Sequence, residues 1–317
     1  MNKPIQTAVA LAAASMPETP APRAATMRSI ERQWHTVRGR AARALGADSS
    51  ALDWIPRPAS ILGGSKKARV AEGASGALVA ISYLAPGPML SRLAGVVDGP
   101  TLCAAAELNN CIEGCLGNDG GRGQLGFPTG TARLSMLGRT VLLIGAPKLF
   151  AELLSADVAR HVRKARSAGK RAFIRLDGTS DVGLAALTLE RLESYGATSY
   201  DYSKIAGRVL NHGERYALTF SATPRTIRAA RAVLERGGSI AVVCSTKSKA
   251  AAYAETVELL SGLARDTGSR FVDGDASEPL ELEPRTIRCL TAKAGSNKAQ
   301  RELEASGLVW SSDGVPV

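Results

Sequence analysis

Short apolar runs alternate with helix-like stretches between residues 77 and 295. The runs expected to form β-strands are residues 78–84, 172–176, 198–202, 216–220, 239–244, 270–274 and 286–291. Amphipathic stretches predict helices at residues 148–168, 184–195, 224–236 and 250–266. Such alternation is typical of parallel strands joined by right-handed crossovers, in a doubly wound sheet or a (β/α) barrel. No G-x-G-x-x-G motif follows the first strand, so we expect an α/β fold with a parallel (β/α) barrel of about seven strands, partial or irregular.

The first 76 residues have a different pattern and predict a basic, partly disordered extension. Ile30, Trp34, Val37 and Ala41 recur at helical spacing within one amphipathic helix at residues 26–45. Its arginines occupy the other faces, which suits contact with nucleic acid or with a partner surface. The alternative is a helix that only packs its Trp34 stripe on the main domain. We therefore expect a barrel-like domain at 77–295 and a tail at 296–317.

Charge supports an anionic partner for this extension. The chain carries a formal net charge of +11, and residues 1–73 contain eleven Lys or Arg against five Asp or Glu, a net charge of +6. Nucleic acid is the first candidate partner, and a solubilising tail is the alternative. No segment is long and apolar enough to span a bilayer, and we expect a cytoplasmic protein with reduced thiols.

Three of the five cysteines lie within thirteen residues, namely Cys103, Cys111 and Cys115. Three thiols suit zinc or an iron–sulfur cluster and leave one coordination position open for chemistry. The glycine-rich turn that follows contains Gly121, Arg122 and Gly123, which are the predicted cofactor-binding residues. The alternative is that Cys111 and Cys115 share one helix face and are buried as small hydrophobic residues.

Polar residues follow nearly every predicted strand. Because chemistry in such barrels lies at the carboxyl ends of strands, we expect these residues to line one pocket. The predicted catalytic residues are Asp177, Asp181, Tyr202, Lys204, Asp273, Asp275 and Lys293. The aspartates suit a hard cation or general acid–base catalysis, and the lysines suit ion pairs or phosphate. Turn formation is the alternative for the two Asp-Gly steps, since Asp binds its own backbone there.

Several motifs together resemble an uncharacterised family of bacteriophage-encoded proteins. They are SYLAP (82–86), the three cysteines, IRLDGTSD (174–181), YDYSK (200–204), LTFS (218–221), AVV (241–243) and VDGD (272–275). The resemblance covers about residues 78–295 and implies a phage-type protein, placed in the host cell cytoplasm, without implying an activity.

A more distant similarity is to radical-SAM enzymes, which combine a partial (β/α) barrel with three cysteines after the first strand. Their pattern is C-x3-C-x2-C, whereas this chain has C-x7-C-x3-C. The similarity implies the architecture and an iron–sulfur cluster, with S-adenosylmethionine as the further cofactor that such a cluster binds.

Two hypotheses of different classes result. The first is a phage-type enzyme that depends on a metal or an iron–sulfur cluster held by the three cysteines, with an unknown small-molecule or nucleotide substrate. The alternative is a nucleic-acid-binding accessory protein of phage replication without catalysis. Its phosphate contacts would be Arg28, Arg32, Arg38, Arg40, Arg43, Lys66, Lys67 and Arg69.

Overall fold

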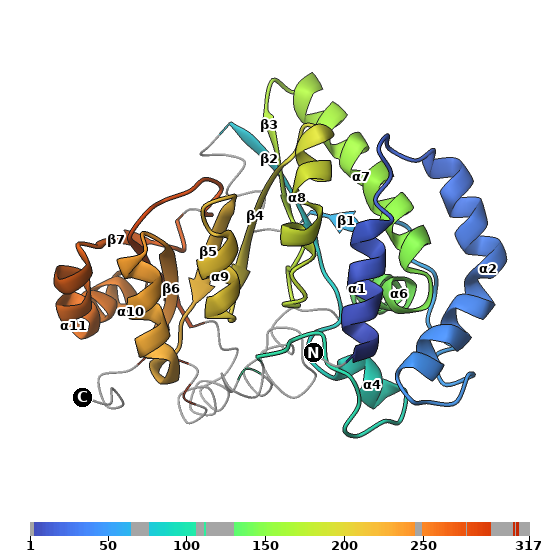
Figure 1. The fold of residues 1–317 in the computed structure, drawn as a ribbon, viewed down its shortest axis with the longest axis horizontal. Helices are drawn as coiled ribbons and strands as arrows, with labels where there is room; N and C mark the ends of the chain where they lie inside the picture. Colours follow the sequence, from blue (N-terminus) through green and yellow to red (C-terminus); the bar gives the residue numbers. More distant parts are fainter. Residues whose placement is uncertain are drawn as a thin grey trace. The chain divides into compact units, whose positions relative to one another are not determined.

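The computed structural model describes residues 3–64, 76–105, 111, 130–244, 249–276, 278–292, 307 and 309–310 (Figure 1). Internal contacts divide the chain into two compact units. The first unit comprises Met1–Ala104 and Pro128–Ser199, and the second comprises Ala105–Phe127 and Tyr200–Val317. The sequence-predicted boundary at residue 76 falls within the first unit.

Eight strands form one sheet in the order β1-β2-β3-β4-β5-β6-β8-β7. The strands are β1 (Leu62–Gly63), β2 (Ala77–Ser82), β3 (Arg171–Arg175), β4 (Thr198–Ser203), β5 (Ala217–Ser221), β6 (Ser239–Cys244), β7 (Arg270–Asp273) and β8 (Thr286–Thr291). All neighbouring pairs are parallel except β1 with β2, which is antiparallel. The expected α/β class is therefore confirmed.

The sheet is open, so the expected closure into a barrel is not found. Within the described residues, β1 and β7 form the two edges and no ladder joins them. Closure requires the two edge strands to pair with each other. Here β8 occupies the place beside β6, and β7 lies outside it as the edge strand. At the other edge, the antiparallel β1 covers the free side of β2.

The first unit is rich in helices. They are α1 (Lys3–Ala14), α2 (Arg23–Ala44), α4 (Met89–Leu93), α6 (Thr131–Gly145), α7 (Pro147–Ser167) and α8 (Leu184–Ser194). The stripe of α2 that contains Ile30 and Trp34 is buried, and α2 packs against α6 and α7. A Cβ atom on Gly145 would lie 2.1 Å from the Val37 carbonyl oxygen, so only glycine permits this close helix crossing.

Hydrogen bonds tie the segment after α2 to this helical layer. The Trp34 indole N–H donates to the Ile55 carbonyl oxygen at 3.0 Å. The buried carboxylate of Asp157 on α7 accepts the Ile61 N–H at 2.6 Å and pairs with the Arg23 guanidinium at 3.1 Å. Residues 3–64 of the predicted extension thus belong to a folded layer, in which α2 covers the range where a helix was expected.

In the second unit, the sheet carries helices on one face and a covering segment on the other. The helices are α9 (Ala206–His212), α10 (Ile227–Glu235) and α11 (Lys249–Thr267) (Figure 1). Thr256 of α11 lies 2.9 Å from the buried Cys244 sulfur. Residues 278–284 cover the opposite face, where Glu283 pairs with the buried Arg288 at 2.6 Å. No helix among the residues that the structure describes is long and apolar enough to cross a membrane.

Candidate functional site

Asp177 follows β3 in the first unit and is 97% buried, with 3% of its surface exposed. Its carboxylate accepts the Ser180 hydroxyl at 2.8 Å, the Val182 N–H at 3.1 Å and the Gly183 N–H at 2.7 Å. These hydrogen bonds shape the turn that leads into α8, and both N–H groups precede the first residue of that helix, Leu184. They engage the Asp177 carboxylate with its own loop.

The same loop is held closely against β2. The Gly178 N–H donates to the Ser82 carbonyl at 3.0 Å, and a Cβ atom on Gly178 would lie 2.6 Å from that oxygen. The Thr179 hydroxyl donates to the Leu84 carbonyl at 2.5 Å. The D-G-T-S-D motif therefore requires glycine at its second position for close packing, and it fixes the chain after β2.

Cys103 lies beside Asp181 in the first unit. The two residues form a parallel bridge, and the Asp181 N–H donates to the Leu102 carbonyl at 3.1 Å. The Cys103 sulfur accepts the Gly87 N–H at 3.3 Å and is half-buried. Cys111, in the second unit, is also half-buried. Cys115, Gly121, Arg122 and Gly123 lie outside the described residues.

In the second unit, the ends of β4 and β5 bring Lys204 and Ser221 together. The Lys204 ammonium donates to the Ser221 hydroxyl at 2.9 Å and to its carbonyl at 3.2 Å. Tyr202, two residues earlier, places its hydroxyl 3.5 Å from the Glu278 carboxylate. Ser221 was not among the predicted catalytic residues, although the motif LTFS that ends in it carried the signal.

Asp273 and Asp275 connect the ends of β7 and β8. The Asp273 carboxylate accepts the Asp275 N–H at 2.8 Å and the Ala276 N–H at 3.2 Å, which is a turn arrangement. The Asp275 carboxylate accepts the Thr291 N–H at 2.7 Å. Lys293 lies outside the described residues.

The predicted site residues thus fall into separate groups. Asp177, Asp181 and Cys103 belong to the first unit, whereas Tyr202, Lys204, Asp273 and Asp275 belong to the second. One pocket for all of them remains a prediction. Within the part of the chain that the structure describes, no three His, Cys, Asp or Glu side chains are grouped so that they could hold a metal ion.

The arginines of α2 and its flanking segments divide into two sets. Some have partners inside the protein: Arg23 pairs with Asp157, and Arg57 pairs with Glu31 at 3.3 Å. Arg38 is half-buried, pairs with Asp53 at 3.5 Å and donates to the Asp53 carbonyl. Arg38 was predicted to contact phosphate, but these contacts engage it in holding the loop after α2.

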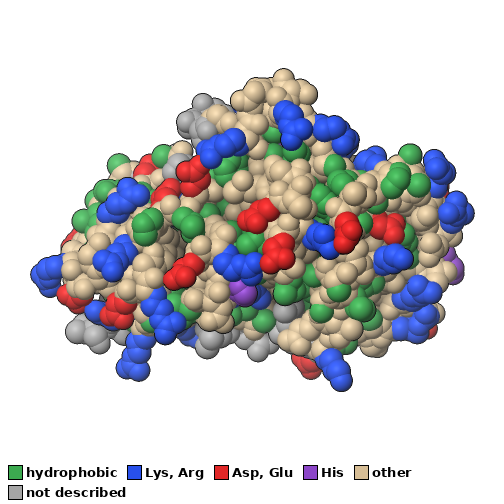
Figure 2. Space-filling view, turned by 45° about the horizontal axis from the view of Figure 1, so that its top comes forward, with side chains coloured by type: hydrophobic (Ala, Val, Ile, Leu, Met, Phe, Trp, Pro, Cys, Tyr) green, Lys and Arg blue, Asp and Glu red, His purple; other side chains and the backbone are tan. Residues whose placement is uncertain are grey.

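The second set points outward. Arg28, Arg40 and Arg43 are exposed and form no ion pair or hydrogen bond with any residue that the structure describes. Arg32 is exposed and reaches only the Ser29 hydroxyl, at 3.3 Å. Figure 2 shows Lys and Arg side chains along the edge of the first unit where α2 lies. The outward face of α2 therefore presents cations whose hydrogen-bonding groups are available to a ligand.

Comparison with protein families matches residues 61–311 to the family described as gene product 88. The chain belongs to the gene product 88 family. The resemblance to an uncharacterised phage-type family is thereby confirmed. Neither the curated proteins nor the solved structures include a match, so the similarity to radical-SAM enzymes remains a prediction.

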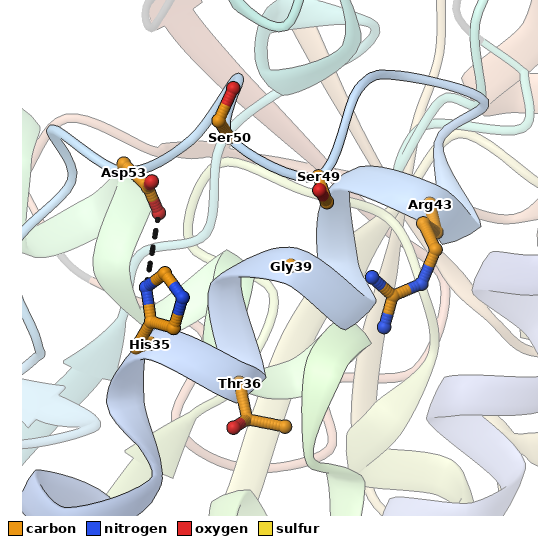
Figure 3. A pocket seen from close by; sticks show the side chains of 7 residues that line it. All are labelled: His35, Thr36, Gly39, Arg43, Ser49, Ser50 and Asp53. Atoms are coloured by element: carbon orange, nitrogen blue, oxygen red, sulfur yellow. Dashed lines mark ion pairs between the residues drawn. The ribbon is translucent and has the colours of Figure 1, made fainter.

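The gene product 88 match begins next to β1, so α1 and α2 precede it. Two hollows flank the outward face of α2. One, of about 260 Å³, is lined by His35, Thr36, Gly39, Arg43, Ser49, Ser50 and Asp53 (Figure 3). The other, of about 420 Å³, is lined by Ser29, Gln33, Arg40, Gly145, Ala146, Pro147, Lys148, Leu149 and Glu152. Helical periodicity alone could have indicated this polar face, since it lies opposite the apolar stripe.

Proposed function

We propose that this gene product 88 protein is a nucleic-acid-binding accessory protein of phage replication that contacts phosphates through the outward face of α2. The supporting observation is that Arg28, Arg40 and Arg43 are exposed and unpartnered among the described residues, while neighbouring arginines are engaged in the fold. Lys66, Lys67 and Arg69 lie outside the described residues.

The physical basis is electrostatic. Each arginine that replaces a counterion on a phosphate contributes to affinity without reading the base sequence. An arginine already paired with a buried carboxylate, such as Arg23, cannot contribute without breaking that pair. The proposal therefore assigns binding to the outward arginines of α2. The total charge of the chain contributes little to it.

Substitution tests this proposal better than truncation. Deleting α2 would expose the apolar surface of α6 and α7, on which its Trp34 stripe packs. Arg28→Gln/Arg40→Gln removes two outward charges and keeps that packing. Arg228→Gln/Arg236→Gln is the matched control, because both of these exposed arginines lie on or beside α10 and likewise form no described contact.

The measurement is fluorescence anisotropy with labelled single-stranded and double-stranded oligonucleotides at low salt. We expect the α2 pair to weaken binding by at least tenfold more than the α10 pair does, with similar losses for unrelated sequences. Absence of binding by the wild-type chain, or equal losses in the two variants, would refute the proposal.

A second candidate function is a metal- or iron–sulfur-dependent enzyme, supported by the surroundings of Cys103. The Cys103 sulfur accepts a backbone N–H, and Cys103 lies beside Asp181. Hydrogen bonds of this kind to metal-bound thiolates help set the reduction potential of a cluster. In this proposal Cys103, Cys111 and Cys115 hold zinc or a cluster that supplies Lewis-acid or redox chemistry. S-adenosylmethionine would then be the further cofactor. The catalytic residues would be Asp177, Asp181, Tyr202, Lys204, Asp273, Asp275 and Lys293.

Metal and sulfide analysis after anaerobic purification tests this second function. We expect stoichiometric metal in the wild-type chain, its loss in Cys103→Ser, and its retention in Cys289→Ser. Cys289 is the control thiol, because it lies in β8 and is far in sequence from the three predicted ligands. A metal-free, folded wild-type protein would exclude this function.

A further inference from the structure

The hollow beside the last two turns of α2 has the donors that a phosphate group requires. Figure 3 shows the His35 ring and the Arg43 guanidinium on either side of the Gly39 backbone, with Ser49 on the returning loop. Arg43, Thr36 and Ser49 all line the hollow, and they carry a guanidinium and two hydroxyl groups. Guanidinium groups bind phosphate oxygens in pairs, and Ser or Thr hydroxyls commonly complete such contacts.

The charges around the hollow leave one cation uncompensated. Asp53 on the rim pairs with Arg38 at 3.5 Å and lies 3.6 Å from the His35 ring nitrogen. Ser50 donates its hydroxyl to Asp48 at 2.6 Å, so this hydroxyl is engaged outside the hollow. Arg43 forms no ion pair with any residue in the described part of the chain. Arg43 is therefore the cation on the lining of the hollow that is available to an anion.

Gly39 gives an independent indication that the space is required. Glycine is the least favourable residue in a helix interior after proline. Packing does not demand it here, because a Cβ atom on Gly39 would meet the Arg43 guanidinium at 3.5 Å and the Ser49 carbonyl at 3.6 Å, which are ordinary contacts. A larger side chain would instead grow into the hollow and displace Arg43.

We infer that this hollow binds one phosphate of a nucleic-acid backbone, held by Arg43 with Thr36, Ser49 and His35 around it. Its volume of about 260 Å³ lies below the range of about 300–1,000 Å³ that is usual for small-molecule pockets, which suits a single charged group. The inference rests on the proposed nucleic-acid function and names one contact point within it.

The test compares a charge deletion with a filling substitution in the full chain. Arg43→Gln removes the cation, and Gly39→Leu fills the hollow while the net charge stays the same. Gly39→Ala and Arg236→Gln are the matched controls, since the first adds only an ordinary contact and the second removes an exposed charge of the second unit. Anisotropy with labelled oligonucleotides is recorded over a series of salt concentrations, and circular dichroism checks folding.

We expect both test variants to bind about tenfold more weakly at low salt and to lower the slope of log affinity against log salt by about one, with both controls near the wild type. A folded Gly39→Leu or Arg43→Gln that binds like the wild type would overturn the inference and leave the proposed function standing. No binding by the wild type would refute both. Displacement of the oligonucleotide by micromolar adenosine monophosphate at constant ionic strength would assign the hollow to a free nucleotide and overturn the backbone assignment.

Discussion

At the ends of β3 and β7, the carboxylates of Asp177 and Asp273 accept N–H groups of their own loops. On the outward face of α2, by contrast, Arg28, Arg40 and Arg43 are exposed and have no partner among the described residues. Both regions are rich in polar side chains in the sequence. Among the described residues, these carboxylates at the strand ends are engaged in their own loops, whereas these arginines of α2 are available to a ligand.

This comparison shows why the number of polar residues is a poor guide to a binding site. A side chain whose hydrogen bonds maintain the fold must lose them before it can bind a ligand, and that loss opposes binding. An exposed arginine without a partner has no such cost beyond ordering its side chain. Substitutions of engaged groups should therefore lower stability, whereas substitutions of available groups should not.

The largest effect is expected at Asp157, a buried carboxylate that accepts a backbone N–H and pairs with an arginine. Asp157→Ala removes the acceptor of the buried Ile61 N–H and leaves Arg23 without its carboxylate partner. We expect a loss of about 3 kcal/mol or more in the free energy of unfolding, measured by urea denaturation. Arg28→Ala is the control and should unfold like the wild type, because Arg28 has no described contact to lose.

Thiol reactivity gives the next largest contrast. Burial raises the pKa of Cys244 to about 12 and that of Cys289 to about 11, from an ordinary value of 9.0. Since the thiolate is the reactive form, these two thiols should react with iodoacetamide at pH 8 about a hundredfold or more slowly than an ordinary thiol. Cys103 and Cys111 are half-buried and should be modified first, as peptide mass spectrometry can show.

The same two pKa values predict how stability depends on pH. Because both are raised in the folded state, their stabilising effect is complete below about pH 9 and is lost as the pH rises towards 11–12. Cys244→Ala should reduce this alkaline loss of stability in thermal melts. A variant with the wild-type alkaline profile would show that Cys244 is not responsible.

Asp177 should matter for stability more than an exposed aspartate does. Asp177→Ala leaves the N–H groups of Val182 and Gly183 without their acceptor, which should cost about 2 kcal/mol in urea denaturation. Asp98→Ala is the control, because Asp98 is exposed and forms no described contact. Equal stability of the two variants would contradict the turn role of Asp177.

The smallest effect is expected at Ser221. Ser221→Ala removes one hydrogen bond from Lys204 and keeps the contact with the Ser221 carbonyl. We expect a loss of about 1 kcal/mol or less in the free energy of unfolding, since Ser221 is only half-buried. A loss of several kcal/mol would show that Lys204 and Ser221 form part of a larger buried network.

Periodicity predicted most of the fold. All seven strands expected from apolar runs are present, and α2 lies where the spacing of Ile30, Trp34 and Val37 placed a helix. Closure of the sheet could not be predicted in this way, because it depends on whether the two edge strands pair with each other. Nor does periodicity give the strand order, in which β8 lies between β6 and β7.

The candidate sites were harder to predict for a different reason. The sequence shows that Arg38 and Arg40 are both arginines on one helix, but only the fold gives Arg38 a partner in Asp53 and leaves Arg40 outward. In the same way, the residue type of Asp177 suits catalysis and turn formation equally well. The deciding hydrogen bonds come from residues 180–183 once the loop is folded.

The most direct test of the central claim is the salt dependence of oligonucleotide binding by the wild type and the two double variants. For Arg28→Gln/Arg40→Gln, we predict that the slope of log affinity against log salt falls by about two, because two phosphate contacts are lost. For Arg228→Gln/Arg236→Gln, the slope should equal that of the wild type. Slopes that fall equally in both variants would contradict the claim that the available arginines of α2 form the nucleic-acid contact.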